Sequence, residues 1–197
     1  MAARRLIVGI SGATGIVYGV RLLEWLRPTG VETHLVVSRA ADLTRAHETA
    51  LGARELRALA DVSYDVDDLG AAISSGSFPT LGMVVIPCSV KSLAEVATGV
   101  TSTLLTRAAD VVLKQRRRLV LVVRETPLHA GHLRNMLAAT EAGAVVMPPV
   151  PAFYTLPKTV DDIVDDTVAR VLDLFDVDVG RVKRWGEDIS RPGHAPR

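Results

Sequence analysis

The chain has 197 residues, 48% of them hydrophobic and 23% charged, with one cysteine and a formal net charge of +1. This length fits one domain with a full hydrophobic core, the single cysteine excludes an intramolecular disulfide framework, and the near-neutral charge favours neither nucleic acid nor an anionic membrane as a partner. No apolar run approaches the ~20 residues of a membrane span and no signal-peptide pattern is present, so the sequence predicts a cytoplasmic protein.

The first half of the chain alternates short apolar runs with amphipathic segments. Residues 6–10 predict a strand buried on both faces, followed by a small-residue turn and a helix over 16–26 that Pro28 and Gly30 end. Further predictions are a strand over 31–37, one or two helices over 39–60 broken near Leu51 and Gly52, an irregular segment over 61–80, and a strand over 83–86 stopped by Pro87.

The second half continues the same alternation. It predicts a short helix from about 88 to 98, an amphipathic helix over 103–114, a strand over 119–123, a loop over 124–128, a helix over 132–141, a short strand over 144–147, a proline-rich loop, a helix over 161–175 and a polar tail.

Strands that alternate with helices favour right-handed βαβ units and a mostly parallel sheet. We therefore expect a single-domain, doubly wound, Rossmann-like α/β fold with helices on both faces of the sheet. In such folds ligands bind beyond the carboxyl ends of the strands. The loops at those ends contain residues 11–15, Ser38, 88–92 and 124–125.

The turn after the first strand is the first candidate ligand site. Gly12 and Gly15 permit a tight turn, and Thr14 offers a hydroxyl where the next helix begins. Helix N-terminal amides and the helix dipole attract phosphate. The spacing from Gly9 onward differs from the dinucleotide fingerprint G-x-G-x-x-G, so the turn alone fits a phosphate site and a plain strand–helix connection about equally well.

Hydroxyl residues recur at the other predicted helix starts along this edge. Ser38 follows the second strand, and Ser89 and Ser92 follow the third. Each alone is explained by helix N-capping, which contributes about 1 kcal/mol. Their convergence on one edge with Arg124 favours a phosphate-bearing cofactor.

Several further residues carry suitable chemistry without a distinctive pattern. Lys114, Tyr154 and Arg170 lie near predicted element ends, where cationic or phenolic groups could hold a phosphate. Taken singly, each is more often a solvated surface residue or a salt-bridge partner. Glu125 could act as an acid or base, or pair with its neighbouring arginine, and Glu48 has no distinguishing local signal.

The sequence favours neither a metal site nor a catalytic cysteine. The acidic residues over 161–166 fit the first turn of a helix, where the helix dipole favours acids. His129 and His132 lack further ligands nearby. Cys88, at a strand end, is typical of a small buried apolar residue.

Taken together, these loops resemble the flavin prenyltransferases, the UbiX family, and most closely the branch associated with phenolic-acid decarboxylases. The matching segments are residues 12–15, Ser38, 48–49, 74–78, 86–91, 107–114, 119–125, 151–154, 160–165, 168–170 and 184–185.

The resemblance implies an enzyme that joins the dimethylallyl group of dimethylallyl monophosphate to N5 and then C6 of reduced FMN without a metal. The prenylated FMN would pass to a UbiD-type decarboxylase, and the enzyme would be a homo-dodecamer with sites at subunit interfaces. The implied domain covers residues 1–178 and binds FMN, followed by a C-terminal arm over 179–197.

The resemblance also implies the role of each site residue. FMN would be bound by Gly12, Ala13, Thr14, Ser38, Ser89, Val90, Lys91, Ser92 and Arg124. The prenyl phosphate would be bound by Arg107, Lys114, Tyr154 and Arg170. Glu48 and Glu125 would be the catalytic carboxylates, assisted by Thr14 and Lys114.

Thr14 is one departure from the family pattern, since many members carry serine there, and its extra methyl group restricts the hydroxyl's rotamers. Two other functions share features with this sequence. An FMN-dependent cysteine-type decarboxylase would require a Pro-x-Met-Asn segment, where this chain has Pro87-Cys88-Ser89. A non-catalytic protein that delivers FMN would leave the set of Lys114, Glu125, Tyr154 and Arg170 unexplained.

Overall fold

The structure is a computed structural model that describes residues 4–181, 184, 188 and 189. The chain divides into two compact units, Met1–Pro149 and Val150–Arg197, which are described in turn. The sequence-based boundary at residue 178 stays a prediction, and Trp185, in the matched tail segment, lies outside the described residues.

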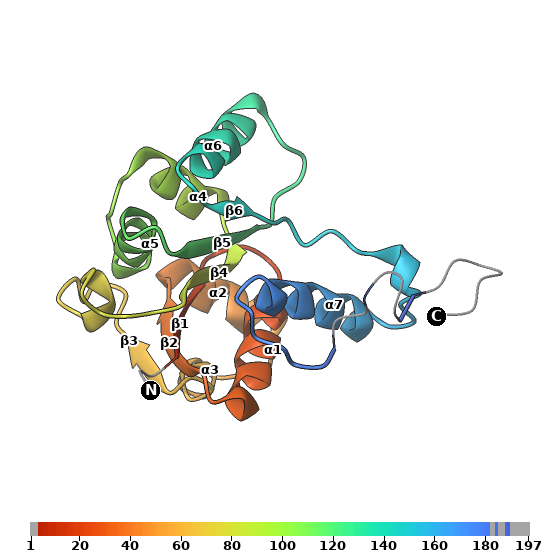
Figure 1. Cartoon of the computed structure of the whole chain (residues 1–197). Helices are drawn as coiled ribbons and strands as arrows, with labels where there is room; N and C mark the ends of the chain where they lie inside the picture. The colour runs from red at the N-terminus through yellow and green to blue at the C-terminus, as the bar shows by residue number, and fades with distance from the viewer. Residues whose placement is uncertain (1–3, 182–183, 185–187, 190–197) are drawn as a thin grey trace. The chain divides into compact units, whose positions relative to one another are not determined.

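The first unit contains a six-stranded parallel sheet in the order β3-β2-β1-β4-β5-β6, the doubly wound order expected from the sequence (Figure 1). Its strands are β1 (Arg5–Ile10), β2 (Glu32–Val37), β3 (Val62–Tyr64), β4 (Gly82–Cys88), β5 (Arg118–Val123) and β6 (Val145–Val146). Its helices are α1 (Ile16–Leu26), α2 (Arg39–Glu48), α3 (Ala53–Arg57), α4 (Val90–Thr98), α5 (Leu104–Lys114) and α6 (Ala130–Glu141), with 3-10 turns η1 (Arg27–Thr29) and η2 (Ala72–Ser74).

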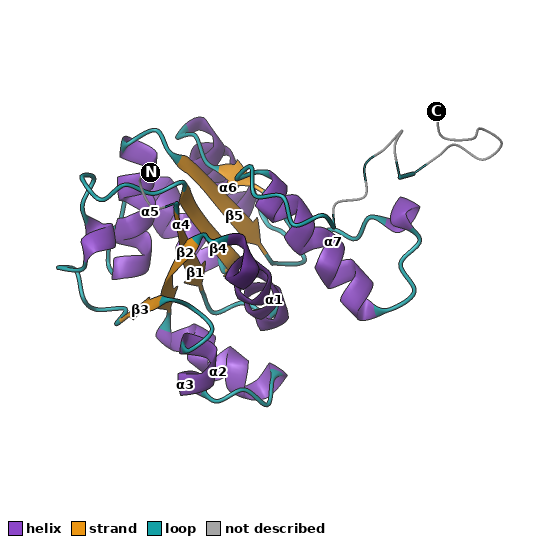
Figure 2. Ribbon diagram, turned by 60° about the horizontal axis from the view of Figure 1, so that its bottom comes forward, coloured by secondary structure: helices purple, strands orange, loops and turns teal. Residues whose placement is uncertain are grey.

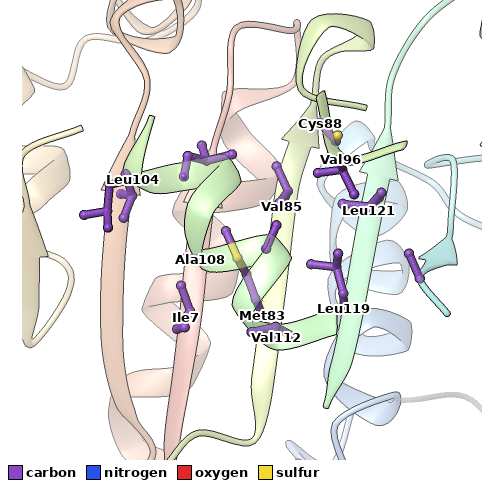
Figure 3. Close-up of a cluster of buried hydrophobic side chains, with 14 of the residues drawn as sticks. Ile7, Met83, Val85, Cys88, Val96, Leu104, Ala108, Val112, Leu119 and Leu121 are labelled. Carbon is purple, nitrogen blue, oxygen red and sulfur yellow. The ribbon is translucent and has the colours of Figure 1, made fainter. Parts of the chain in front are cut away.

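One face of the sheet is covered by α4 and α5. Figure 3 shows Met83 and Leu119 of the strands packing against Ala108 and Val112 of α5. These residues are fully buried, and burial of such side chains contributes about 1.5–3 kcal/mol each. The central strands are therefore continuous apolar runs, as expected for a parallel sheet covered on both sides.

The opposite face is covered by α1 (Figure 2). Gly19 of α1 lies so close to β4 that a Cβ there would be 2.7 Å from the Ile86 carbonyl oxygen. Leu22, Leu23 and Leu26 of the same helix are fully buried. This close packing fixes the start of α1 near the ends of β1 and β4.

Two sequence-based element predictions were wrong. Residues 61–80 were expected to be irregular, but Val62–Tyr64 forms the edge strand β3, paired in parallel with β2. Asp61 stabilises this pairing because its carboxylate accepts hydrogen bonds from the backbone amide and hydroxyl of Thr33, both at 2.7 Å. Pro87 was expected to end the third strand, but β4 continues to Cys88 with a register shift against β5.

The second unit contains η3 (Phe153–Thr155) and α7 (Val160–Asp173). Thr159 caps α7, and Asp162 accepts hydrogen bonds from the amides of Lys158 and Thr159 at 2.8 and 2.9 Å. The acidic start of this segment is therefore a helix cap, as the dipole argument predicted. In the described part of the chain, no helix is both long enough and apolar enough to cross a membrane.

Candidate functional site

The loops that follow four strands are joined to one another at the carboxyl edge of the sheet. The Ser38 amide donates a hydrogen bond to the Ile10 carbonyl at 2.9 Å, and the Arg124 amide donates one to the Cys88 carbonyl at 3.0 Å. These bonds align the ends of β2 with β1 and of β5 with β4. The sequence-based expectation that the candidate loops share one edge is confirmed for this unit.

Ser11 joins the remaining pair of strand ends. Its side chain is buried, and its hydroxyl donates to the Pro87 carbonyl at 3.1 Å and accepts from the Ser89 amide at 2.7 Å. Ser11 therefore links β1 to the start of the α4 segment.

The Gly12–Gly15 turn is held between these strand ends and α2. A Cβ at Gly12 would lie 2.4 Å from the Cβ of Ala40, and Gly15 has a φ of +101°, a region that favours glycine. The Glu48 carboxylate, at the last residue of α2, accepts hydrogen bonds from the amides of Gly15 and Ile16, both at 2.9 Å. Both ends of α2 thus contact the turn.

Two serines cap helices at this edge, and one of them, Ser38, keeps a hydroxyl that can still donate. The Ser38 oxygen accepts the Ala41 amide at 3.1 Å as the cap of α2, which leaves its hydrogen available. The Ser89 oxygen accepts the Ser92 amide at 3.2 Å as the cap of α4 and its hydroxyl donates to the Ser92 hydroxyl. Capping and ligand binding are therefore compatible at Ser38, whereas at α4 the Ser92 hydroxyl, which accepts the bond from Ser89, is the group whose hydrogen can reach a ligand.

A cavity of about 250 Å³ lies between these two helix starts; we call it the rim cavity. Five of the predicted residues line it: Gly12, Ser38, Ser89, Lys91 and Ser92. The sequence analysis missed its other lining residues, which are Arg39, Ala40, Val66, Glu95, Thr103 and Leu105. Only Arg39, directly after Ser38, could have been identified from the sequence, because the others depend on which helices face the cavity.

Lys91 and Glu95 form an ion pair along one side of the rim cavity. The Lys91 Nζ lies 3.0 Å from the Glu95 Oε1, and the Ser102 hydroxyl donates to Glu95 at 3.0 Å. Burial opposes ionisation of Glu95, but the hydrogen bonds from Lys91 and Ser102 outweigh it and hold its pKa below the ordinary value. The carboxylate therefore fixes Lys91 without adding an uncompensated negative charge.

The remaining predicted residues of this edge lie in the turns after β1 and β5. Thr14 and Arg124 are exposed, and Glu125 is partly buried and accepts the Thr126 amide at 3.0 Å. Ala13 and Val90 are partly buried in the first turn and at the first residue of α4.

Lys114 lies at the other edge of the sheet. The first residue of α5, Leu104, donates its amide to the Val66 carbonyl near the rim cavity. Lys114 ends the same helix ten residues later, a distance of about 15 Å along its axis. Arg107 lies one turn into α5 and pairs with Asp110 at 2.8 Å. Within one chain, Lys114 does not meet the rim cavity.

The other two predicted phosphate ligands belong to the second unit. Tyr154 lies in η3 and is 55% exposed. Arg170 lies in the last turn of α7, 3.6 Å from Asp173.

The residues of the site suit a nucleotide phosphate better than metal or cysteine chemistry. Among the described residues, no group of three or more histidine, cysteine or acidic side chains could hold a metal ion. Burial raises the pKa of the Cys88 thiol to about 12, so this residue is no thiolate nucleophile near neutral pH. Figure 3 shows it among apolar side chains at the end of β4. The donors of the rim cavity, by contrast, are hydroxyls, helix amides and cations, which bind phosphate.

Comparison with known proteins agrees with this chemistry. The model of the Flavoprotein family matches residues 1–172. The flavin prenyltransferase UbiX of Salmonella typhimurium is 63% identical over 175 residues, covering 88% of this chain and 93% of that protein. A probable UbiX-like flavin prenyltransferase of Bacillus subtilis is 54% identical and covers 97% of this chain and 94% of its own length.

A solved structure of AnUbiX (PadA1), in complex with FMN and dimethylallyl pyrophosphate, superposes with a TM-score of 0.91 at 52% identity, covering 92% of this chain and 97% of that one. A dodecameric FMN-dependent UbiX-like decarboxylase from Escherichia coli O157:H7 superposes with a TM-score of 0.89 at 54% identity, covering 92% and 98%. The sequence, the sheet order and the phosphate-type donors agree with these matches, and the chain belongs to the UbiX family of flavin prenyltransferases within the flavoproteins.

Proposed function

We propose that this enzyme transfers the dimethylallyl group of dimethylallyl monophosphate to reduced FMN, forming bonds at N5 and then C6 and releasing phosphate. The observation that carries the proposal is the rim cavity, where the Gly12 turn and the caps of α2 and α4 direct hydroxyl and amide donors into one space. Such donors suit the phosphate of FMN.

The chemistry requires stabilisation of the departing phosphate. Without a divalent metal, fixed cations and proton donors must supply it. Lys114, Arg107, Arg170 and the Tyr154 hydroxyl have the required character, and we assign them to the prenyl phosphate. Arg124, Thr14 and the five predicted residues that line the rim cavity (Gly12, Ser38, Ser89, Lys91 and Ser92) are assigned to FMN.

The two carboxylates would move protons in separate steps. Glu125 would exchange a proton with the departing phosphate or with flavin N5, and Glu48 would accept the proton lost from C6 when the second bond forms. The position of Glu48 supports this role, because its carboxylate lies beside the Gly12–Gly15 turn that also carries Thr14.

One chain supplies only part of this site. The rim cavity, at about 250 Å³, is smaller than the 300–1,000 Å³ typical of ligand pockets, and Lys114 lies at the opposite end of α5. We therefore propose that copies of the chain assemble, as a dodecamer, so that the Lys114 of one copy completes the site of another.

The direct test is an anaerobic incubation of the protein with reduced FMN and either dimethylallyl monophosphate or the diphosphate, with and without EDTA. Mass spectrometry of the extracted flavin should find one added five-carbon prenyl unit, unaffected by EDTA and faster with the monophosphate. Bound but unmodified FMN with both donors would contradict the proposal and favour a protein that only delivers the flavin.

The shared site has its own test. Lys114→Ala and Glu125→Gln chains should each be inactive alone. When they are coexpressed, some hybrid sites take an intact Glu125 from one copy and an intact Lys114 from another, so about a quarter of the activity should return. No recovery in coexpressed assemblies would place both residues in the same chain's site.

The prenylated FMN that the enzyme makes would serve a UbiD-type decarboxylase. Addition of the purified product to such a decarboxylase should therefore activate it.

A further inference from the structure

Arg39, to which nothing above assigns a role, lies between two cavities. It is the first residue of α2, directly after Ser38, and it lines the rim cavity. It also lines a second cavity of about 500 Å³ on the β3 side, which we call the outer cavity. Among the residues that the structure describes, only Arg39 and Val66 line both cavities.

The partner of Arg39 belongs to the outer cavity. Its guanidinium forms an ion pair with Asp67, in the loop after β3. The side chains are 80% and 54% exposed, and exposed pairs of this kind contribute little to stability. Asp42, the nearby acid on α2, is instead bound by Arg57 at 2.7 Å. Within the described part of the chain, Arg39 is therefore held by one weak, solvent-exposed contact.

We propose that Arg39 is a ligand of the FMN phosphate and that Asp67 holds it at the boundary of the two cavities until the phosphate binds. The inference rests on the proposed function and adds a residue to it. A phosphate at the start of α2 would meet the Ser38 hydroxyl, whose oxygen is already occupied by the Ala41 amide, and the first amides of the helix. Arg39 supplies the one cation in that turn, with a planar fork that matches two phosphate oxygens.

The exchange of Asp67 for the FMN phosphate as the partner of Arg39 determines how strongly the protein distinguishes FMN from a flavin without phosphate. When Arg39 leaves Asp67 for the phosphate, one charged contact is lost and a stronger one is formed, because a phosphate carries up to two negative charges. Asp67 therefore competes with FMN for the same guanidinium. Removal of the arginine should weaken FMN binding, and removal of the aspartate should strengthen it.

The test compares the Kd of FMN and of riboflavin, measured by quenching of flavin fluorescence, for the assembled full-length protein and four variants. Arg39→Gln should weaken FMN binding roughly ten- to a hundredfold, with riboflavin unchanged. Asp67→Asn should tighten FMN binding two- to fivefold, again without effect on riboflavin. The matched control is Arg57→Gln, which breaks an ion pair of the outer cavity away from the rim cavity and should change neither Kd.

Arg39 is exposed, so its variants should fold normally. Arg39→Lys keeps the charge but loses the planar fork, and its Kd for FMN should lie between those of the wild type and Arg39→Gln. Equal weakening of FMN and riboflavin binding in Arg39→Gln, or unchanged FMN binding in that variant, would overturn the assignment of Arg39. The proposed function would still stand if the wild type prenylates FMN. Absence of FMN binding by the wild type would overturn both the assignment and the proposed function.

Discussion

The Glu48 carboxylate accepts a hydrogen bond from the Gly15 amide at 2.9 Å, which joins the end of α2 to the start of α1. Gly15 and Ile16 carry amides at the start of α1 that have no partner within the helix. Glu48 therefore acts as a distant cap for α1 and fixes the turn that carries Thr14.

Glu48→Ala should consequently affect both stability and binding. Loss of the cap should lower the free energy of unfolding by about 1 kcal/mol, as removal of other helix N-caps does, and should weaken FMN binding. Urea unfolding and flavin fluorescence measure the two effects. Glu141→Ala is the matched control, because Glu141 is an exposed last residue of α6. Unchanged stability in Glu48→Ala would show that the cap contributes nothing in solution.

Gly12 should tolerate no side chain. Gly12→Ala places a Cβ 2.4 Å from the Cβ of Ala40 and should displace the turn, weakening FMN binding at least tenfold. The double variant Gly12→Ala/Ala40→Gly removes the closest contact and should recover part of the affinity, although the Ala40 backbone remains within 3.2 Å. Gly70→Ala, in an open loop, should bind FMN normally. Full affinity in Gly12→Ala alone would refute this packing argument.

Stability should fall as the pH drops below about 6.5 because of His34. This side chain is buried, and burial lowers its pKa although the Glu32 carboxylate accepts a hydrogen bond from its ring. Between the folded pKa and 6.5 the unfolded chain binds more protons, so acid favours unfolding, with a slope of at most about 1.4 kcal/mol per pH unit. Above pH 7.5 both states are neutral at this residue and the effect vanishes.

Urea unfolding at a series of pH values from 5 to 8 checks this expectation. His34→Gln should lose the dependence, whereas His47→Gln, an exposed histidine of α2, should keep it. Asp61 titrates in a separate window: hydrogen bonds from Thr33 lower its pKa, so the stability that it contributes is lost only below about pH 4. An unchanged slope in His34→Gln would assign the dependence to other groups.

Cys88 should be unreactive in the folded protein. Its thiol is fully buried with a pKa of about 12, so modification by a disulfide reagent at pH 8 should be slow and should follow unfolding. Cys88→Ala should retain at least half of the prenyl transfer rate. Rapid labelling of the native protein, or loss of transfer with intact FMN binding, would contradict this expectation.

The sequence by itself determined the parallel sheet and its ligand edge. Apolar runs such as Leu119–Val123 read as strands because both faces are covered, and the hydroxyl residues after them marked the carboxyl ends. Ser38 and Ser89 cap the helices that follow them, as their sequence positions predicted, because capping depends on a few neighbouring residues. The resemblance to the UbiX family, carried by these local motifs, was confirmed by the comparisons.

Only the tertiary structure decided which side chains meet. The edge strand β3 is short and polar, and its pairing depends on the distant contact between Asp61 and Thr33. The contacts of Glu48 with Gly15 and of Arg39 with Asp67 join residues 28 or more positions apart. The length of α5 separates Lys114, at its last residue, from the rim cavity near its first residue. Such relationships arise from the packing of whole elements, and no local pattern of residues encodes them.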